Sequence, residues 1–169
     1  MKVTCCAWAP DGQTFVTGGD DFDLIVWNLQ GTAIHKWNGP GRRIYDCAIT
    51  PDGKRLVIID TDTMVHVYNY ITRELEYECS LGSDLTSISV SKDSKYMIVN
   101  MASLQEVHMY DIETTGLVQR FVGQKQRDYV IRNCFGGADE NLVLSGSEGG
   151  FIDMCQTSSM TGMRLIKGW

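Results

Sequence analysis

Apolar and polar residues alternate in short segments along the chain, and turn residues separate these segments. In the first segment Val3, Cys6 and Trp8 lead into Pro10-Asp11-Gly12, and residues 44–49 lead into a second Pro-Asp-Gly sequence in the same way. Alternation over five or six residues followed by a tight turn is typical of antiparallel β-strands and not of helices. The pattern therefore predicts β-hairpins at the start of the chain.

The pattern occurs four times, so the chain is internally repetitive. The turn Asp residues are separated by 41, 41 and 46 residues, and a second anchor follows each of them after 16 or 17 residues. The first anchors are Asp11, Asp52, Asp93 and Asp139, and the second anchors are Trp27-Asn28, Tyr68-Asn69, Tyr110-Asp111 and Cys155-Gln156. Two strands are predicted before each second anchor, a third ends at it, and a fourth follows at Ala33–Trp37, Leu75–Cys79, Leu117–Phe121 and Met163–Ile166.

Four short strands in each of several repeats of about 40–45 residues are typical of the blades of a β-propeller. A single blade cannot bury both of its faces, and stacked blades can. We predict an all-β chain with one propeller domain over residues 1–169, in an incomplete ring of about four blades. The predicted repeats are approximately 3–43, 44–84, 85–130 and 131–169. An immunoglobulin-type sandwich is the all-β alternative, but it does not require a regular period.

The repeat assigns most of the chemically reactive residues to structural positions. Cys6, Cys47 and Cys134 occupy one slot of the repeat, and Cys155 stands in the aromatic anchor slot. We therefore expect all of these thiols to be small apolar side chains in the core. Cys5 and Cys79 have no partner at the spacing of a metal site.

The histidines and the acidic turn residues give no catalytic pattern either. His66 and His108 share a slot two residues before the second anchor, and we expect this slot to face outward because its occupants are mixed. Asp21 and Asp62 precede their anchors by six residues, and we expect them to hold turns. The glycine-rich stretch 146–150 opens no helix and so predicts no phosphate cradle. No catalytic, cofactor-binding or metal-binding residue is predicted, and we expect no enzyme and no cofactor.

Charge and hydropathy narrow the partners. The formal net charge of −6 argues against nucleic acid, because Lys and Arg dominate phosphate binding. The sequence contains no apolar run near the roughly 20 residues of a membrane-spanning helix. We expect no secretory signal, because the first residues lack an apolar stretch. We expect other proteins as partners, with no nucleic acid and no membrane, in the cytoplasm, the nucleus or both.

The anchors resemble those of WD-repeat proteins, although no copy has an intact Trp-Asp and the Gly-His before each repeat is reduced, for example to Gly82-Ser83. The loss of that His implies a greater dependence on apolar packing. Residues 7–12, 26–29, 121–126 and 129–138 further resemble the WD-repeat subunit of the GID/CTLH ubiquitin ligase.

This resemblance implies a scaffold or substrate-recruiting subunit that acts in proteasomal degradation, with ligase components and substrates as partners. The alternative is a WD-repeat scaffold of another complex, in signalling or RNA processing. Members of the subfamily carry an N-terminal helical region and about seven blades, so this chain is expected to be a truncated form. Its open blade edges and apolar blade face would favour self-association.

The candidate binding residues are basic side chains at one rim of the propeller. The loops that join each fourth strand to the next first strand share a rim with the loops between second and third strands, where Asp20 and Asp62 lie. Loops on a rigid scaffold are frequent recognition sites, and Arg is favoured at interfaces. We predict protein binding by Arg42, Arg43, Lys125, Arg127 and Arg132, with a solvated rim of mutually compensating charges as the alternative.

Overall fold

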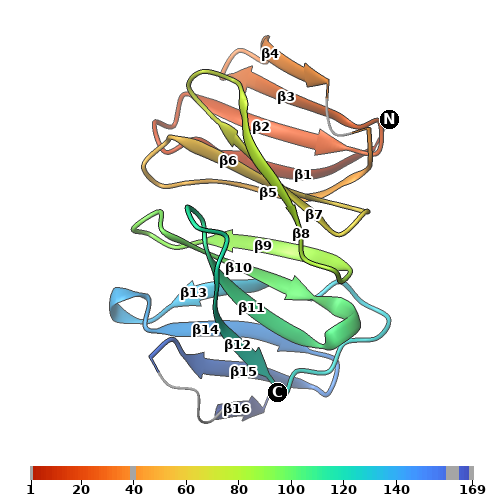
Figure 1. The fold of residues 1–169 in the computed structure, drawn as a ribbon, viewed down its shortest axis with the longest axis vertical. Helices are drawn as coiled ribbons and strands as arrows, with labels where there is room; N and C mark the ends of the chain where they lie inside the picture. Colours follow the sequence, from red (N-terminus) through yellow and green to blue (C-terminus); the bar gives the residue numbers. More distant parts are fainter. Residues whose placement is uncertain (1, 39–40, 159–163, 168–169) are drawn as a thin grey trace. The chain divides into compact units, whose positions relative to one another are not determined.

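The computed structural model of the chain describes residues 2–38, 41–158 and 164–167. Within these residues the fold is all-β, and its strands form four antiparallel four-stranded sheets, which confirms the predicted number and type of blades (Figure 1). In every sheet the strands are hydrogen-bonded in chain order. The part of the chain that the structure describes contains no helix with the length and apolar character of a membrane span.

The strands begin and end close to the predicted positions. The first blade contains β1 (Val3–Trp8), β2 (Thr14–Gly19), β3 (Asp23–Asn28) and β4 (Ala33–Asn38). The second contains β5 (Ile44–Ile49), β6 (Arg55–Asp60), β7 (Met64–Asn69) and β8 (Leu75–Ser80). The third contains β9 (Leu85–Val90), β10 (Tyr96–Met101), β11 (Glu106–Asp111) and β12 (Leu117–Val122). The fourth contains β13 (Asn133–Gly136), β14 (Leu142–Ser147), β15 (Phe151–Gln156) and β16 (Arg164–Lys167). Two short 3-10 helices, η1 (Ala102–Leu104) and η2 (Ala138–Glu140), lie between strands of the third and fourth blades.

The second residue of the second anchor holds the turn between the third and fourth strands. The side-chain oxygen Oδ1 of Asn28 accepts the backbone N–H groups of Gln30 and Thr32, at 3.1 and 2.8 Å. Asn69 accepts two backbone N–H groups in the same way at 3.0 and 2.9 Å, and Asp111 does so at 3.0 and 2.8 Å. This is the usual reason for Asn or Asp at a turn, and it explains the recurrence of these residues in three blades.

Residues 1–85 form one compact unit that contains the first two blades. β1 and β5 lie side by side, and the hydroxyl of Thr4 donates to the backbone carbonyls of Ile44 and Gly18, at 2.5 and 3.2 Å. The facing sheets enclose an apolar core that includes wholly buried residues from both blades: Val16, Leu24, Val26, Ile44, Leu56 and Ile58. Gly18 is required at this contact, because a Cβ there would lie 2.9 Å from the Cys5 sulfur and 3.0 Å from a methyl carbon of Ile44.

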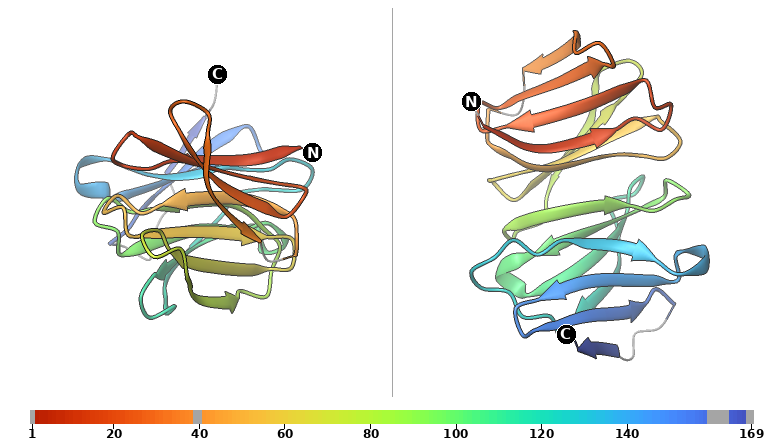
Figure 2. Two further views of the ribbon diagram at one scale, coloured as in Figure 1. Left: turned by 90° about the horizontal axis from the view of Figure 1, so that it is seen from above. Right: turned by 180° about the vertical axis from the view of Figure 1, so that it is seen from behind.

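Residues 86–169 form the second unit, with the third and fourth blades. Its core also contains residues from both of its sheets. Figure 2 shows the ribbon of these two sheets from two further directions. Ile98, Val107 and Phe121 of the third blade pack with Val143 and Cys155 of the fourth. The expectation that Cys155 fills a core position is therefore confirmed.

The first strand of the fourth blade departs from the predicted alignment by one residue. In the fourth blade Phe135 pairs with the core residue Val143, and it lies four residues before the turn residue Asp139. In the second blade the equivalent residue is Ile49, which pairs with the core residue Leu56 and lies three residues before Asp52. The turn that contains η2 is thus one residue longer than its counterpart. A slip of one residue sends each side chain to the opposite face of a strand. Cys134 is consequently exposed, and its assignment to the core is wrong.

Candidate functional site

The predicted rim of the first unit is present, and its charges are paired. Nε of Arg42 lies 2.8 Å from Oδ2 of Asp62, and Nε of Arg43 lies 2.7 Å from Oδ1 of Asp20. Each Arg comes from the loop between β4 and β5, and each Asp from a turn between the second and third strands of a blade. The two sets of loops therefore share a rim in this unit, as predicted. In each of these partly exposed ion pairs the Asp compensates the charge of the Arg, so Arg42 and Arg43 offer little uncompensated charge to a partner.

In the second unit Lys125, Arg127 and Arg132 lie in the long connection between β12 and β13. Residues 123–130 of this connection are named the 123–130 loop below. One carboxylate oxygen of Glu148, from the turn between β14 and β15, accepts the backbone N–H groups of Arg127, Asp128 and Tyr129, at 2.7, 2.9 and 2.9 Å. These three hydrogen bonds hold the pKa of Glu148 below its ordinary value, because they stabilise the carboxylate.

Two further hydrogen bonds join the loop to the same turn. The N–H of Glu148 donates to the carbonyl of Lys125 at 2.8 Å, and the N–H of Lys125 donates to the Ser147 hydroxyl at 3.0 Å. Gly150, at φ +79°, follows two residues after Glu148 and adopts a backbone conformation that favours glycine. The glycine-rich stretch of the sequence thus forms a turn that presents a carboxylate to backbone donors.

A cluster of buried amides anchors the loop from beneath. Nδ2 of Asn100, a wholly buried residue of β10, donates to the Gln126 side-chain oxygen at 2.6 Å, and its Oδ1 accepts from Gln124 at 2.9 Å. Nε2 of Gln126 donates to the backbone carbonyl of Tyr129 at 3.0 Å. Buried hydrogen bonds of this kind favour a single conformation, because breaking one leaves a further buried polar group without a partner.

Above these anchors the loop presents apolar and basic side chains to solvent. Tyr129 is 73% exposed and Val130 is 59% exposed, while Lys125 and Arg127 are exposed beside them. Arg132, also exposed, lies immediately before β13, and its carbonyl accepts the N–H of Gly146 at 3.4 Å. An exposed Tyr next to Arg on a rigid backbone has the composition of an interaction hot spot. We take the 123–130 loop as the candidate site.

Sequence reasoning found the basic residues of this site but missed the residues that build it. Glu148 and Asn100 were not assigned to a site, and Gln124, Gln126 and Tyr129 entered only as part of a resemblance. The one local signal was the alternation of two glutamines with Lys125 and Arg127, which has the period of an extended segment with one buried side.

The histidine slot proved to be buried, so the expectation of an outward-facing position is wrong. His66 and His108 are each 4% exposed, and Asp153 and Ile25 in the same slot are also buried. His66 pairs with the core residue Ile58, so it lies on the face of the second blade that packs against the first. His66 contacts Asp60 at 2.9 Å and Glu78 at 3.2 Å, and His108 contacts Glu106 at 2.6 Å.

Two further expectations need correction. Cys6 is exposed although its counterpart Cys47 is buried, because Cys47 faces the first blade and Cys6 lies on the opposite face of that blade. In the second blade the turn is held by Asp60 rather than Asp62: Oδ1 of Asp60 accepts the N–H groups of Asp62 and Met64 at 2.8 and 3.1 Å. Among the described residues no group of three or more His, Cys, Asp or Glu could hold a metal ion.

Comparisons with known proteins agree with the repeat architecture. Residues 1–28 match the family described as WD domain, G-beta repeat. The chain is 39% identical to GID complex subunit 7 of Schizosaccharomyces pombe over 88% of the chain and 30% of that protein. It is 33% identical to the WD repeat-containing protein WDS homolog of Arabidopsis thaliana over 99% of the chain and 32% of that protein. It is 35% identical to an Arabidopsis WD repeat-containing protein 26 homolog over 85% of the chain and 24% of that protein. The chain thus spans about a third or less of the length of these relatives.

Proposed function

The chain belongs to the WD-repeat proteins, and from that premise we propose that it acts as a non-catalytic scaffold or substrate-recruiting subunit of a GID/CTLH-type ubiquitin ligase. The similarity to GID complex subunit 7 supports the proposal, because it extends over 88% of the chain. In this role the chain binds other proteins, and the ligase complex directs the bound target to the proteasome.

The observation that carries a binding role is the pre-formed 123–130 loop. Its backbone is fixed by Glu148 and its glutamines by Asn100, so little conformational entropy is lost when a partner binds. The exposed side chains of Tyr129 and Arg127 are of the types that dominate binding energy at protein interfaces. The paired Arg42 and Arg43 are given a lesser part, since their charges are already compensated.

Affinity purification of the tagged chain from cells tests both the general role in protein binding and the assignment to a ubiquitin ligase. We expect a RING-containing ligase to co-purify and to form polyubiquitin chains when E1, E2 and ubiquitin are added. Substitution of Tyr129→Ala together with Arg127→Ala should lower recovery of the partner by about tenfold or more, as removal of two hot-spot residues does. Ile71→Ala, at a side chain that is 71% exposed in a turn of the first unit, is the matched control.

The possible outcomes distinguish the ligase assignment from the assignment of the binding site. Recovery of a stable protein complex without ligase activity would contradict the ligase assignment and favour a scaffold of another complex. Equal recovery with the double variant and with wild type would remove the 123–130 loop as the binding site. The proposed localisation, in the cytoplasm, the nucleus or both, is tested by imaging a fluorescent fusion.

A further inference from the structure

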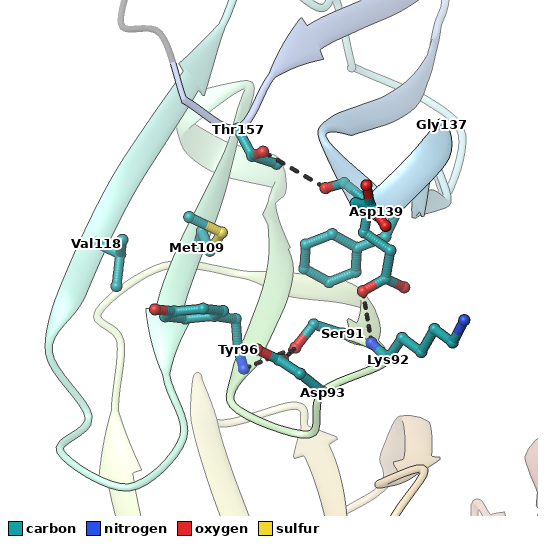
Figure 3. Close-up of a pocket in the computed structure, with 11 residues that line it drawn as sticks. Ser91, Lys92, Asp93, Tyr96, Met109, Val118, Gly137, Asp139 and Thr157 are labelled. Carbon is teal, nitrogen blue, oxygen red and sulfur yellow. Dashed lines mark hydrogen bonds between the residues drawn. The ribbon is translucent and has the colours of Figure 1, made fainter.

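A second surface of the second unit carries a pocket that the proposed function does not use. It has a volume of about 720 Å³ and opens between the β9–β10 turn, the η2 segment and the strands β11 and β12 (Figure 3). Sites that bind ligands commonly have volumes of about 300–1,000 Å³. The pocket is therefore large enough to admit a bulky side chain.

The pocket and the 123–130 loop lie at opposite ends of the strands. Val118, in the pocket wall, follows Leu117, which pairs with Tyr110 at one end of β11, while Val122 pairs with Glu106 at the other end and leads into the loop. A strand of this length spans about 20 Å. A partner bound at one site thus leaves the other site accessible.

One side of the pocket is apolar. Tyr96, Met109 and Val118 line it together in Figure 3, and Phe135 also contributes to the lining. Val118 is 43% exposed on β12, the edge strand of the third blade, whereas Met109 is only 5% exposed. An apolar group inserted here would lose contact with water against Tyr96 and Phe135, and the resulting burial of apolar area would favour binding.

The opposite side is polar and is held in place by hydrogen bonds. The N–H of Lys92 donates to a carboxylate oxygen of Glu140 at 2.6 Å, which ties the β9–β10 turn to the η2 segment. The Thr157 hydroxyl donates to the Glu140 carbonyl at 3.4 Å, and the N–H of Tyr96 donates to the Ser91 hydroxyl at 2.9 Å. These bonds frame the pocket before any ligand arrives.

Charge selects the occupant. Three carboxylates, from Asp93, Asp139 and Glu140, line the pocket with the single basic residue Lys92. Asp139 is exposed, has a backbone φ of +58°, and is labelled among the lining residues in Figure 3. An excess of negative charge next to an apolar wall is complementary to a group that combines an apolar side chain with a cation.

We propose that this pocket binds an extended peptide segment of a partner protein, through a bulky apolar side chain next to an Arg or Lys. The apolar side chain packs between Val118, Met109 and Phe135, and the basic side chain pairs with Asp139. The open edge of β12 runs beside the pocket and offers backbone hydrogen bonds to an extended segment. The proposal does not depend on membership of a ubiquitin ligase.

Selection from a phage-displayed library of random peptides on the immobilised full chain tests the proposal. We expect the enriched peptides to share an apolar residue adjacent to Arg or Lys. Binding of a synthetic enriched peptide, measured by fluorescence polarisation, should weaken about tenfold or more in Val118→Asp, because the wall loses its apolar character. Val122→Asp is the matched control, since Val122 is 57% exposed on the same strand but lies outside the pocket.

The charge component has its own pair of variants. Asp139→Asn removes the charge and retains a residue that tolerates positive φ, so it should weaken binding of the basic peptide and leave a peptide with Gln in place of the basic residue unaffected. Glu113→Gln, at an exposed residue outside the pocket lining, should change neither. Selection that yields no shared sequence, that yields acidic peptides, or that yields peptides bound equally by Val118→Asp and Val122→Asp overturns the proposal.

Discussion

At the scale of single residues, His66, His108 and Asp153 share one slot and are all buried, but they differ in their polar partners. His66 has Asp60 and Glu78 as partners, and His108 has Glu106 and the Tyr110 hydroxyl, which lies 3.2 Å away. The carboxylate of Asp153 is buried and has no carboxylate or histidine partner of this kind. Burial raises the pKa of Asp153, because a buried charge is unfavourable, and the Ser147 side chain offsets this only in part.

Asp153→Asn is expected to stabilise the second unit at neutral pH by about 1–3 kcal/mol, because it removes a buried charge. A raised pKa in the folded state means that the wild type regains stability as the pH falls through that value. The advantage of the variant should thus shrink on acidification and disappear below the ordinary value of 3.8. Urea unfolding of both proteins between neutral and acidic pH measures this difference, and a constant difference across the range would contradict it.

Thr115 marks a second residue-scale conflict. It occupies the positive-φ position of the turn between β11 and β12, at φ +58°, where the first blade has Gly31 at φ +75°. A β-branched residue in this conformation is strained by about 1–2 kcal/mol. Relief of this strain in Thr115→Gly should raise the free energy of unfolding. The increase should not exceed about 1 kcal/mol, because the greater freedom of Gly in the unfolded chain offsets part of it.

Thermal or urea unfolding of Thr115→Gly gives the direct comparison, with Thr114→Gly as control. Thr114 donates its backbone N–H and its hydroxyl to Asp111, at 2.8 and 3.0 Å, so loss of its side chain should destabilise the same turn. Opposite signs for two adjacent Thr residues are the expected result. A destabilised Thr115→Gly would mean that the side chain contributes more than the strain costs.

At the scale of elements, the 123–130 loop depends on one side chain from a different turn. Glu148→Gln removes the negative charge that accepts three backbone N–H groups. We expect the amides of Arg127, Asp128 and Tyr129 to exchange with solvent faster in the variant, while the strands β10 and β11 keep their protection. Hydrogen–deuterium exchange followed by mass spectrometry measures this, and unchanged loop exchange would show that the amide cluster alone holds the loop.

Acidification should loosen the 123–130 loop, as the Glu148→Gln substitution does. The pKa of Glu148 is lowered in the folded state, so its contribution is fully present above the ordinary value of 4.5 and is lost as the pH falls through the folded value. The wild-type loop should therefore lose exchange protection on acidification, after correction for intrinsic exchange rates. Glu148→Gln should show no such dependence.

The elements that sequence could predict are those defined by short-range patterns. Every strand from β1 to β12 follows from alternation and from turn residues a few positions away. The register of β13 did not follow, because one extra residue in the η2 turn is invisible to an alignment anchored at Asp139. The partners of the 123–130 loop were also beyond local patterns: Glu148 lies 21 residues from Arg127, and Asn100 lies 26 residues from Gln126.

At the scale of the whole molecule, equivalent faces of the two blades of the first unit differ in burial: the face is buried in the second blade and partly exposed in the first. Cys47, Leu56 and Tyr68 of the second blade are buried against the first blade. Their counterparts in the first blade are Cys6, Phe15 and Trp27, and these belong to a partly exposed face on which Trp8 is 61% exposed. Trp8 rests on Phe15 with 5.2 Å between ring centroids. An apolar face of this kind is suited to pack against another blade.

This face should make the isolated chain self-associate at high concentration. Trp8→Glu is expected to shift sedimentation-equilibrium data toward the monomer, because it places a charge in the apolar contact. Ile71→Glu, at a side chain 71% exposed in the β7–β8 turn, is the control and should leave association unchanged. A wild-type chain that remains monomeric at all concentrations would contradict the prediction.

The distribution of the thiols has a practical consequence. Cys6 and Cys134 are exposed, one in each unit, whereas Cys5, Cys47 and Cys155 are buried. Burial also raises the pKa of the half-buried Cys79, which lowers its share of reactive thiolate. Maleimide dyes should thus attach selectively at two native positions. Energy transfer between a donor and an acceptor there would report the separation of the units in solution, without any engineered cysteine.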